Sequence, residues 1–405
     1  MAVVVAALPA CALDTEVWDP IPDPPPPADG TAGPSWPADE PLPPSFDTPT
    51  WVTSPAPGRI AIGWRTAAPT TGRVVLTRVL DGDTAVDEAA VQFLQPEEAQ
   101  VHHVDLGELA PASGYRYRVV LADGAEREGV FTTSGLASWR FIHLAETHAP
   151  DESEHVTAFA ASIRAFRPQV AIESGDMVTV GDDLDAWRTY LLDARPWISN
   201  VILLPAHSNH VHGFLGNAIL KDFFELPDNE RWYATRYGDV QIVTLDSNDN
   251  GESPDLVEEP DWVRDRLTTL RAASDPPRFT IGAWHHPACS SSYASRSASR
   301  RWVIDNLVRA FLDAGGIDLI LVGHDKYYER SVLTVDGVEI THLMDNAGRL
   351  SPGGAGGNEP ECAPVRTDTN TRSLALFEVS PDAVTADVVN EDGLTIDQFE
   401  IPISD

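Results

Sequence analysis

The sequence predicts an α/β (α+β) domain that follows a small all-β domain. From residue 139 onward, apolar strand-like runs alternate with segments of helical periodicity, as they do in sheets covered by helices. Between residues 51 and 134, short strand-like segments with alternating polarity are separated by turn residues. With 405 residues, the chain is long enough for two or three domains and a large core.

The N-terminal part of the chain predicts no globular domain. Residues 1–11 are short and apolar, and the segment from Leu8 to Cys11 resembles the cleavage site of bacterial lipoproteins, in which the cysteine becomes the lipidated first residue. The alternative is a disordered tail that happens to contain a cysteine. Residues 12–50 are dominated by Pro, Asp and Gly, and they predict an extended, disordered spacer. Trp18 and Trp36 within it are expected to be unstructured, with docking points as the alternative.

The charge of the chain limits its partners. It carries 28 basic and 62 acidic residues, a formal net charge of −34, so nucleic acid is not expected as a bulk partner. No apolar run reaches the ~18 residues of a membrane span, so the expected contact with a membrane is a lipid anchor at Cys11. We therefore expect an extracytoplasmic protein, either a bacterial lipoprotein at the cell envelope or a secreted protein. The sequence leaves its oligomeric state open.

The other two cysteines are expected near the candidate site. Cys289 follows the segment His285–Pro287, and Cys362 follows the glycine-rich segment 351–357, which could overhang the site. In an exported chain, a disulfide between them is favoured over two free thiols.

The all-β domain is predicted to span residues 51–134. Its expected strands are Arg59–Trp64, Arg73–Val79, Gln100–Leu106, Tyr115–Leu121 and Gly129–Thr132. The segment Leu109–Val119 resembles the Leu-x-Pro-x-Thr-x-Tyr-x-Tyr-x-Val signature of fibronectin type III modules. We expect this domain to serve as a scaffold, with direct contact to a substrate as the alternative.

Polar side chains follow five apolar runs of the α/β domain, at points where strands are expected to end. These runs are Phe141–Leu144, Val170–Ile172, Val201–Leu204, Phe279–Ile281 and Ile317–Val322. The polar residues that follow them are Glu146, His148, Asp176, Asn209, His210, His285 and His324. Carboxylate, amide and imidazole groups at one edge of a sheet are suited to a divalent metal ion.

The remaining elements cover or complete the sheet. Apolar residues at helical spacing predict helices from Val156 to Phe166 and from Val303 to Phe311. The strand that precedes Asp246 ends in Leu-Asp-Ser-Asn, and Asp246 is expected to be structural. Strand-like runs at Ser373–Val379 and Ala383–Val389 close the chain.

The order of these motifs resembles that of the calcineurin-like metallophosphoesterases, and among them that of the purple acid phosphatase branch. The family pattern runs Asp-x-His, Gly-Asp, Gly-Asn-His-Glu or Asp, His-x-Pro and Gly-His-x-His. The corresponding segments here are Glu146-Thr147-His148, Gly175-Asp176, Ser208-Asn209-His210-Val211, His285-His286-Pro287 and Gly323-His324-Asp325-Lys326. The resemblance implies a metallophosphoesterase-type β-sandwich flanked by helices over residues 139–405, preceded by a fibronectin III-like sandwich.

The resemblance also implies one or two divalent metal ions, with Fe, Zn or Mn as candidates. In the family two metals lie about 4 Å apart, and a hydroxide held by them attacks phosphorus. Asp176 would be the bridging ligand. One metal position would take Asp176, Asn209, His285 and His324, and all four residue types are present. Thr179 stands where the purple enzymes have an iron-binding tyrosine, so a purple diferric type centre is not expected.

The second metal position is altered by Lys326. By resemblance it would take Glu146, His148, Asp176 and a histidine that this sequence replaces with Lys326. An ammonium group has no lone pair to give, and it would repel a dication ~4 Å away by roughly 8 kcal/mol at an effective dielectric near 20. The lysine could stand in for the second metal, ion-paired with Glu146 and Asp176. It could instead lose its proton and ligate, or point away; we favour the first arrangement.

The leading functional expectation is metal-dependent hydrolysis of phosphate esters, with a small phosphorylated substrate. By resemblance His210 is the catalytic residue that contacts the phosphate or protonates the leaving group. A rival expectation is a catalytically impaired relative that binds an anionic ligand or a protein partner at the cell surface, with Lys326 as the anchor of the anion. A third is a purely structural surface protein. Four further histidines are expected to be structural or merely nearby: His143, His207, His212 and His286.

Overall fold

The computed structural model describes most of the chain. The described residues are 33–56, 58–79, 91–151, 153–212, 214–248, 258–292, 297–348 and 359–403. The expected lipid anchor at Cys11 and the glycine-rich segment 351–357 therefore lie outside the described residues. None of the helices formed by the described residues has the length and the apolar character needed to cross a membrane.

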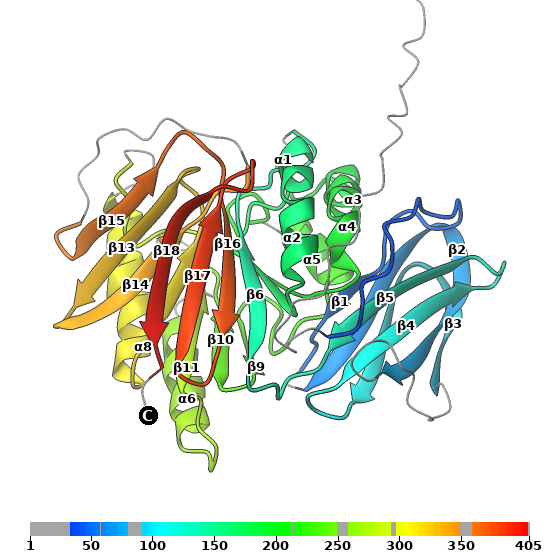
Figure 1. Ribbon diagram of the computed structural model, residues 1–405, viewed down its shortest axis with the longest axis horizontal. Helices are drawn as coiled ribbons and strands as arrows, with labels where there is room; N and C mark the ends of the chain where they lie inside the picture. Colours follow the sequence, from blue (N-terminus) through cyan, green and yellow to red (C-terminus); the bar gives the residue numbers. More distant parts are fainter. Residues whose placement is uncertain are drawn as a thin grey trace, which may run out of the picture.

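Two large sheets organise the molecule (Figure 1). The larger sheet has eleven strands in the order β18–β17–β16–β6–β7–β8–β1–β2–β4–β5, with β3 paired to β2. Its strands are β1 (Trp51–Thr53), β2 (Arg59–Val79), β3 (Val91–Glu108), β4 (Gly114–Leu121), β5 (Glu126–Thr132), β6 (Trp139–Leu144), β7 (Val170–Glu173), β8 (Ile202–Pro205), β16 (Leu374–Val379), β17 (Ala383–Val389) and β18 (Thr395–Pro402).

The smaller sheet has seven strands in the order β15–β13–β14–β12–β11–β10–β9. Its strands are β9 (Tyr233–Tyr237), β10 (Val240–Thr244), β11 (Phe279–Ala283), β12 (Leu319–Val322), β13 (Tyr328–Val335), β14 (Val338–Met344) and β15 (Cys362–Asp368). Strands β10, β11, β12 and β14 pair in parallel, whereas β9, β13 and β15 pair with their neighbours in antiparallel fashion.

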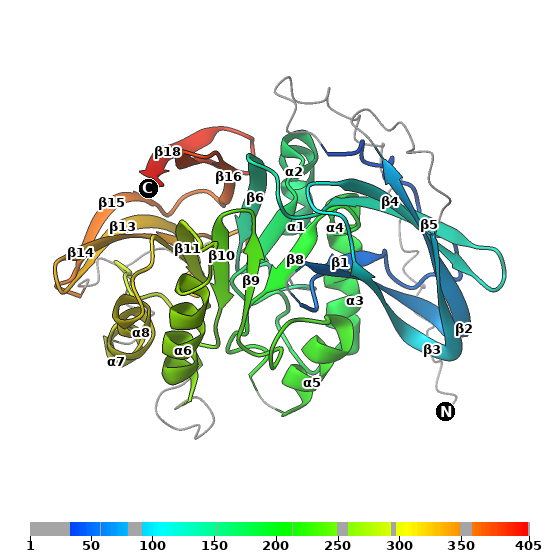
Figure 2. The same cartoon turned by 90° about the horizontal axis from the view of Figure 1, so that it is seen from below.

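Helices flank the pair of sheets, with α1 to α5 beside the larger sheet and α6 to α8 beside the smaller one (Figure 2). They are α1 (Ser153–Ala158), α2 (Ala160–Phe166), α3 (Leu184–Asp193), α4 (Arg195–Ile198), α5 (Phe214–Phe223), α6 (Glu259–Arg271), α7 (Ser297–Trp302), the π-helix η2 (Val303–Val308) and α8 (Arg309–Asp313).

Strand β12 shows why the sequence predicts a sheet that is buried on both faces. Leu319 and Leu321 belong to the apolar cluster between the two sheets, whereas Ile320 and Val322 belong to the apolar cluster that includes residues of α6, η2 and α8. Because successive side chains of a strand point to opposite faces, an unbroken apolar run is needed when both faces are covered. The predicted β-sandwich flanked by helices is confirmed.

The all-β region predicted before the α/β domain is formed by β1 to β5. Two of the predicted strands, Arg59–Trp64 and Arg73–Val79, are parts of the single long strand β2, which pairs with both β3 and β4. Strand β1 pairs antiparallel with β2 and, through Val52 and Ile202, parallel with β8. The β region and the α/β domain therefore share one sheet, and the fibronectin type III assignment stays a prediction.

Residues 33–50 pack against the α/β domain, whereas the sequence predicted a disordered spacer up to residue 50. Trp36 is only 8% exposed, and the guanidinium of Arg164 lies 5.9 Å from its ring centroid. Arg164 also donates a hydrogen bond to the carbonyl of Pro37, and Arg167 donates one to the carbonyl of Pro34. Proline lacks an N–H group but keeps its carbonyl acceptor, so arginines of the helical layer can hold this segment in place.

Candidate metal centre

The carboxyl ends of parallel strands from both sheets carry the candidate residues. Strands β6, β7 and β8 run parallel in the larger sheet, and β10, β11 and β12 run parallel in the smaller one. The loops after them place Glu146 and His148 after β6, Asp176 after β7, Asn209 and His210 after β8, His285 after β11, and His324 after β12. Residues that are far apart in the sequence thereby meet at one edge, where α/β folds bind ligands.

Asp176 lies at the centre of the resulting cluster. Its Oδ2 atom is 3.3 Å from Nε2 of His285, 3.4 Å from Nε2 of His148 and 3.7 Å from Nε2 of His210. Its Oδ1 atom is buried and has no hydrogen-bond partner among the described residues. His324 joins the cluster through its Nδ1 atom, which is 3.2 Å from Nε2 of His285.

Glu146 provides a second, fully buried carboxylate beside Asp176. Its Oε1 atom accepts a hydrogen bond from the backbone N–H of His324. Its Oε2 atom lies 3.0 Å from Nε2 of His148 and 4.0 Å from Nζ of Lys326. A Cβ atom at Gly323 would lie 2.8 Å from Oε1 of Glu146, so only glycine leaves room for this carboxylate.

Two histidines of the cluster are oriented by backbone carbonyls. Nδ1 of His285 lies 2.9 Å from the carbonyl oxygen of Ser174, and Nδ1 of His210 is bonded to the carbonyl oxygen of Thr179. A carbonyl oxygen can only accept, so each Nδ1 carries a proton and each neutral ring presents its lone pair at Nε2, next to Asp176. Histidines that bind metal ions are commonly oriented by such a bond.

The electrostatics of the cluster favour a cation among its side chains. Burial raises the pKa of Asp176, but His285 and the other imidazoles outweigh burial and hold this pKa well below its usual range. Burial lowers the pKa of His285, but Asp176 outweighs burial and raises it to about 9. A carboxylate that strongly favours positive neighbours would equally favour a divalent ion, which would displace protons from the imidazoles.

The backbone at the cluster adopts a conformation that side chains disfavour. Five residues have a positive φ: Glu146 (64°), His148 (45°), Asp176 (55°), His324 (77°) and Lys326 (58°). Each such residue costs on the order of 1 kcal/mol or more, which the surrounding fold must offset. Backbone hydrogen bonds between the loops, such as that from His148 N–H to the carbonyl of Asp176 at 2.8 Å, hold them in this form. Strain of this kind collects at functional sites.

The residues present fit a divalent metal ion. Two sets of side chains each place three ligand atoms within 4.8 Å of one another; they are Glu146, Asp176 and His285, and His148, Asp176 and His210. The Oδ1 atom of Asp176, which accepts no hydrogen bond in the described structure, offers a further ligand atom for the metal. Imidazole and carboxylate ligands together suit Fe, Zn or Mn.

The structure does not bring Asn209 into this cluster. Its side chain is exposed and makes no hydrogen bond within the described part of the chain, whereas the neighbouring His210 lies beside Asp176. Ser208, which stands where the family pattern has glycine, is buried.

Residues 140–328, which include the whole cluster, match the model of the calcineurin-like phosphoesterase family. The matched residues make up most of the α/β domain, which is thus similar to the members of that family. Among solved structures, the fold resembles a purple acid phosphatase from yellow lupin (Lupinus luteus) seeds, with a TM-score of 0.69 and 14% identity over 88% of this chain and 75% of that chain. It also resembles PhoD, with a TM-score of 0.64 and 11% identity over 89% of this chain and 92% of that chain.

Two curated relatives come from two strains of Mycobacterium tuberculosis, and both are uncharacterized proteins. Each is 24% identical over 286 residues, which cover 58% of this chain and 51% of the relative. The chain thus spans about half the length of these relatives.

The sequence left four histidines outside the candidate site, and the structure separates them into two groups. Three have no place in the cluster: His143, His207 and His212. His286 lies at the cluster, because its ring centroid is 4.5 Å from that of His324. Its Nδ1 atom is 3.0 Å from Oγ of Ser247, and its backbone N–H donates to the same hydroxyl. The sequence signal for His286 was its place beside His285, and no signal singled out Ser247.

Glu173 lies beneath the cluster, at the end of β7, and is fully buried. Tyr190 donates a hydrogen bond of 2.6 Å to its Oε2 atom, and Thr147 lies 3.1 Å from its Oε1 atom. No basic side chain pairs with it in the described residues, so burial raises the pKa of Glu173 to about 7. Thr147 lies between Glu146 and His148, so this carboxyl group supports the loop that carries both.

Glu173→Gln is expected to stabilise the protein above pH 7 and to leave it unchanged near pH 4.5. The folded state holds the proton of Glu173 up to about pH 7, whereas the unfolded chain releases it near 4.5, so the free energy of unfolding of the wild type falls as pH rises through this window. The fall is about 3 kcal/mol, and glutamine removes it. Urea unfolding of both forms at pH 4.5 and pH 8 measures the difference; an equal difference at both values would contradict the raised pKa.

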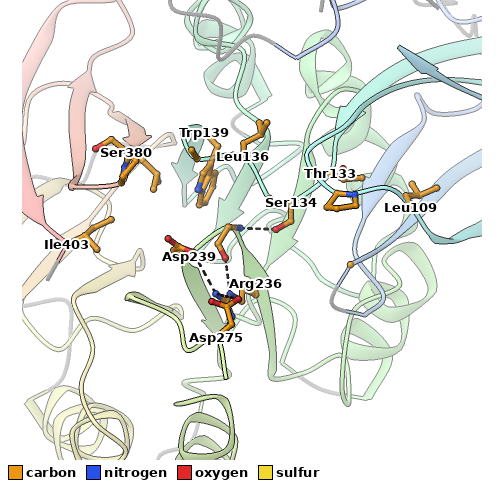
Figure 3. A pocket seen from close by; sticks show the side chains of 17 residues that line it. Leu109, Thr133, Ser134, Leu136, Trp139, Arg236, Asp239, Asp275, Ser380 and Ile403 are labelled. Carbon is orange, nitrogen blue, oxygen red and sulfur yellow. Dashed lines mark hydrogen bonds and ion pairs between the residues drawn. The ribbon is translucent and has the colours of Figure 1, made fainter. Parts of the chain in front are cut away.

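A cavity of about 460 Å3 lies at the opposite end of the strands (Figure 3). It is lined by Trp139 at the start of β6, by Arg236 and Asp239 beside the turn between β9 and β10, and by Ser134 of the preceding segment. The guanidinium of Arg236 lies 3.1 Å from the carboxylate of Asp275 and donates to the carbonyl of Gly238. The positive charge of Arg236 is therefore compensated within the protein and is not free to bind a phosphate. The metal centre remains the candidate active site.

Proposed function

We propose that the chain hydrolyses phosphate esters of small molecules in a metal-dependent reaction. The observation that carries this proposal is the convergence of three imidazole Nε2 atoms on one carboxylate oxygen of Asp176. The family match and the fold shared with a purple acid phosphatase and with PhoD support a metal-dependent phosphoesterase. A bound divalent ion would neutralise phosphate charge and lower the pKa of water at the site.

The accessible side chains of the cluster suit a small anionic group. Asp176 and His148 are each 2% exposed, whereas His210 and Lys326 are 30% and 26% exposed. A phosphate that approaches from this side meets an imidazole and an ammonium group before it meets a carboxylate. The ester group attached to the phosphate would stay outside, which supports a small phosphorylated substrate and leaves its identity open.

We further infer that Lys326 takes the place of a second metal ion. Its Nζ atom lies 4.0 Å from Oε2 of Glu146, at the distance of an ion pair, and it makes no ion pair with Asp176 in the described structure. A dication at the same carboxylate would be repelled by roughly 8 kcal/mol at ~4 Å and an effective dielectric near 20. This supports one metal ion per chain, with the ammonium group as a substitute for the second.

Lys326→His is expected to raise the metal content from about one to about two ions per chain and to speed hydrolysis of generic phosphate mono- and diesters about tenfold. The added imidazole supplies a ligand and removes the repulsion. Metal analysis and turnover are measured on both forms. Lys221→His is the matched control, because Lys221 is the other lysine of the chain and bonds to the carbonyl of Asn229.

If the wild type and Lys326→His each bind one metal ion, Lys326 does not take the place of a second metal ion. No metal and no turnover in any form would refute the hydrolase and favour the second candidate, a protein that binds an anionic ligand or a protein partner through Lys326. The fold is compatible with such a role: it also resembles Plasmodium GAP50, described as the anchor in the inner membrane complex, with a TM-score of 0.52 and 17% identity over 67% of this chain and 90% of that one.

We also propose that the chain works outside the cytoplasm, at the cell envelope or as a secreted protein. The disulfide between Cys289 and Cys362 supports this location, because such bonds persist in oxidising compartments. Cys11, the proposed site of a lipid anchor, lies outside the described residues. The thiol state of the protein recovered from cells tests the location.

A further inference from the structure

His210 occupies the position beside Asp176 that the family pattern assigns to the asparagine before it. Asn209 is exposed, whereas Nε2 of His210 is 3.7 Å from Oδ2 of Asp176. The ring of His210 packs edge-on against that of His148, with centroids 4.8 Å apart. His148 presents its own Nε2 atom to the same carboxylate oxygen at 3.4 Å.

The proton positions on His210 distinguish a ligand from a proton donor. Nδ1 is bonded to the carbonyl oxygen of Thr179, which can only accept, so the proton of the neutral ring sits on Nδ1. The Nε2 lone pair then lies beside a carboxylate oxygen at 3.7 Å, beyond hydrogen-bond distance. Two electron-rich atoms placed this way repel each other unless a cation lies between them. His285 differs, because its Nε2 atom lies 3.3 Å from the same oxygen, where a protonated ring can donate to the carboxylate, while its Nδ1 atom bonds the carbonyl of Ser174.

The two candidate sets of ligands differ in the charge beside them. The set of Glu146, Asp176 and His285 includes the carboxylate whose Oε2 atom lies 4.0 Å from the ammonium group of Lys326. In the set of His148, Asp176 and His210 the carboxylate is that of Asp176, which forms no ion pair with Lys326 among the described residues. A divalent ion in the second set therefore does not compete with the lysine for the carboxylate of Glu146.

We propose that His148, Asp176 and His210 hold the resident divalent ion, and that Asn209 is not a ligand. Two imidazole nitrogens and one carboxylate oxygen form the set, which suits Fe2+, Zn2+ or Mn2+. Thr179 is then a positioning residue, because its carbonyl fixes the proton of His210. The inference rests on the proposed metal-dependent function. It makes His210 a ligand of the metal, whereas the family resemblance implies a proton donor.

Co2+ binding to the full chain tests the assignment without recourse to activity. Apo-protein is titrated with Co2+ while visible absorption reports the ligand field, and circular dichroism verifies the fold. His210→Ala should weaken Co2+ binding by at least about 100-fold, while His210→Asp, which restores a ligand, should recover part of the loss. Asn209→Ala should change binding less than twofold, as should His212→Ala, the control at an exposed histidine.

The alternatives give different results in the same experiment. Loss of Co2+ in Asn209→Ala with retention in His210→Ala would overturn the assignment in favour of the family ligand. If both variants still bind Co2+ and only His210→Ala loses turnover, the assignment is overturned and His210 is a proton donor. Wild-type protein that binds Co2+ and hydrolyses phosphate esters in either case keeps the proposed function. Wild-type protein that binds no Co2+ overturns both.

Discussion

Asp176→Asn is expected to remove the bound metal and to lower kcat/KM by at least about a thousandfold, an increase of roughly 4 kcal/mol in the barrier. Three Nε2 atoms lie 3.3 to 3.7 Å from Oδ2 of Asp176, so this single oxygen organises the centre. Asparagine keeps the shape but removes the charge that favours a cation there. Because Asp176 also raises the pKa of His285, the imidazole should become neutral at lower pH in the variant. Metal analysis and steady-state kinetics measure the two losses.

Asp345→Asn is a suitable control for this substitution. Asp345 is also fully buried and accepts a hydrogen bond from the backbone N–H of Ala375, and burial raises its pKa to about 6. A neutral side chain at position 345 therefore resembles a state that the protein already visits, and metal content should stay within about 20% of the wild type. Wild-type metal content in Asp176→Asn would contradict the central role of Asp176.

Removal of the disulfide is expected to lower the free energy of unfolding by about 4 kcal/mol, the entropy of closing a loop of this length. Cys289 and Cys362 are 73 residues apart in the sequence. The bond ties the buried loop after His285 to β15, an edge strand whose residues are mostly exposed. Because His285 begins this loop, we expect the variant Cys289→Ser/Cys362→Ser to bind metal more weakly as well as to unfold more easily.

Chemical denaturation with and without a reductant separates the disulfide from other effects of the serines. Reductant should lower the free energy of unfolding of the wild type by the contribution of the disulfide. It should leave that of the double variant unchanged. Equal denaturation midpoints for oxidised and reduced wild type would contradict a structural disulfide. Reduced thiols in protein recovered from cells would contradict the proposed location outside the cytoplasm.

The sequence was sufficient to predict the elements that depend on local pattern. Unbroken apolar runs mark buried strands such as β12, and the polar residues after them necessarily lie at the sheet edge. The convergence of Glu146, His148, Asp176, His285 and His324 followed from this rule and from the order of the motifs.

Other features depend on contacts that no local pattern encodes. The sequence cannot tell whether Asn209 or His210 faces Asp176, because the choice depends on the bond from Nδ1 of His210 to the distant carbonyl of Thr179. The helix expected from Val156 to Phe166 is divided into α1 and α2, although its apolar spacing is regular. The composition of residues 33–50 predicts disorder. The segment is held by Arg164 of α2 and by Arg167, which follows α2, and both lie more than a hundred residues away in the sequence.

The strand β1 gives the N-terminal β region a part in protecting the sheet edge of the α/β domain. It pairs with β8 on one side and with β2 on the other, so the parallel strands that carry the metal centre do not end in a bare edge at β8. Tyr117 of β4 reinforces the junction by donating a hydrogen bond to the carbonyl of Ser199, just before β8. An unpaired strand edge is a template for pairing with another chain. The β region thus acts as a permanent cover against self-association, and a relative that lacks it must protect that edge in some other way.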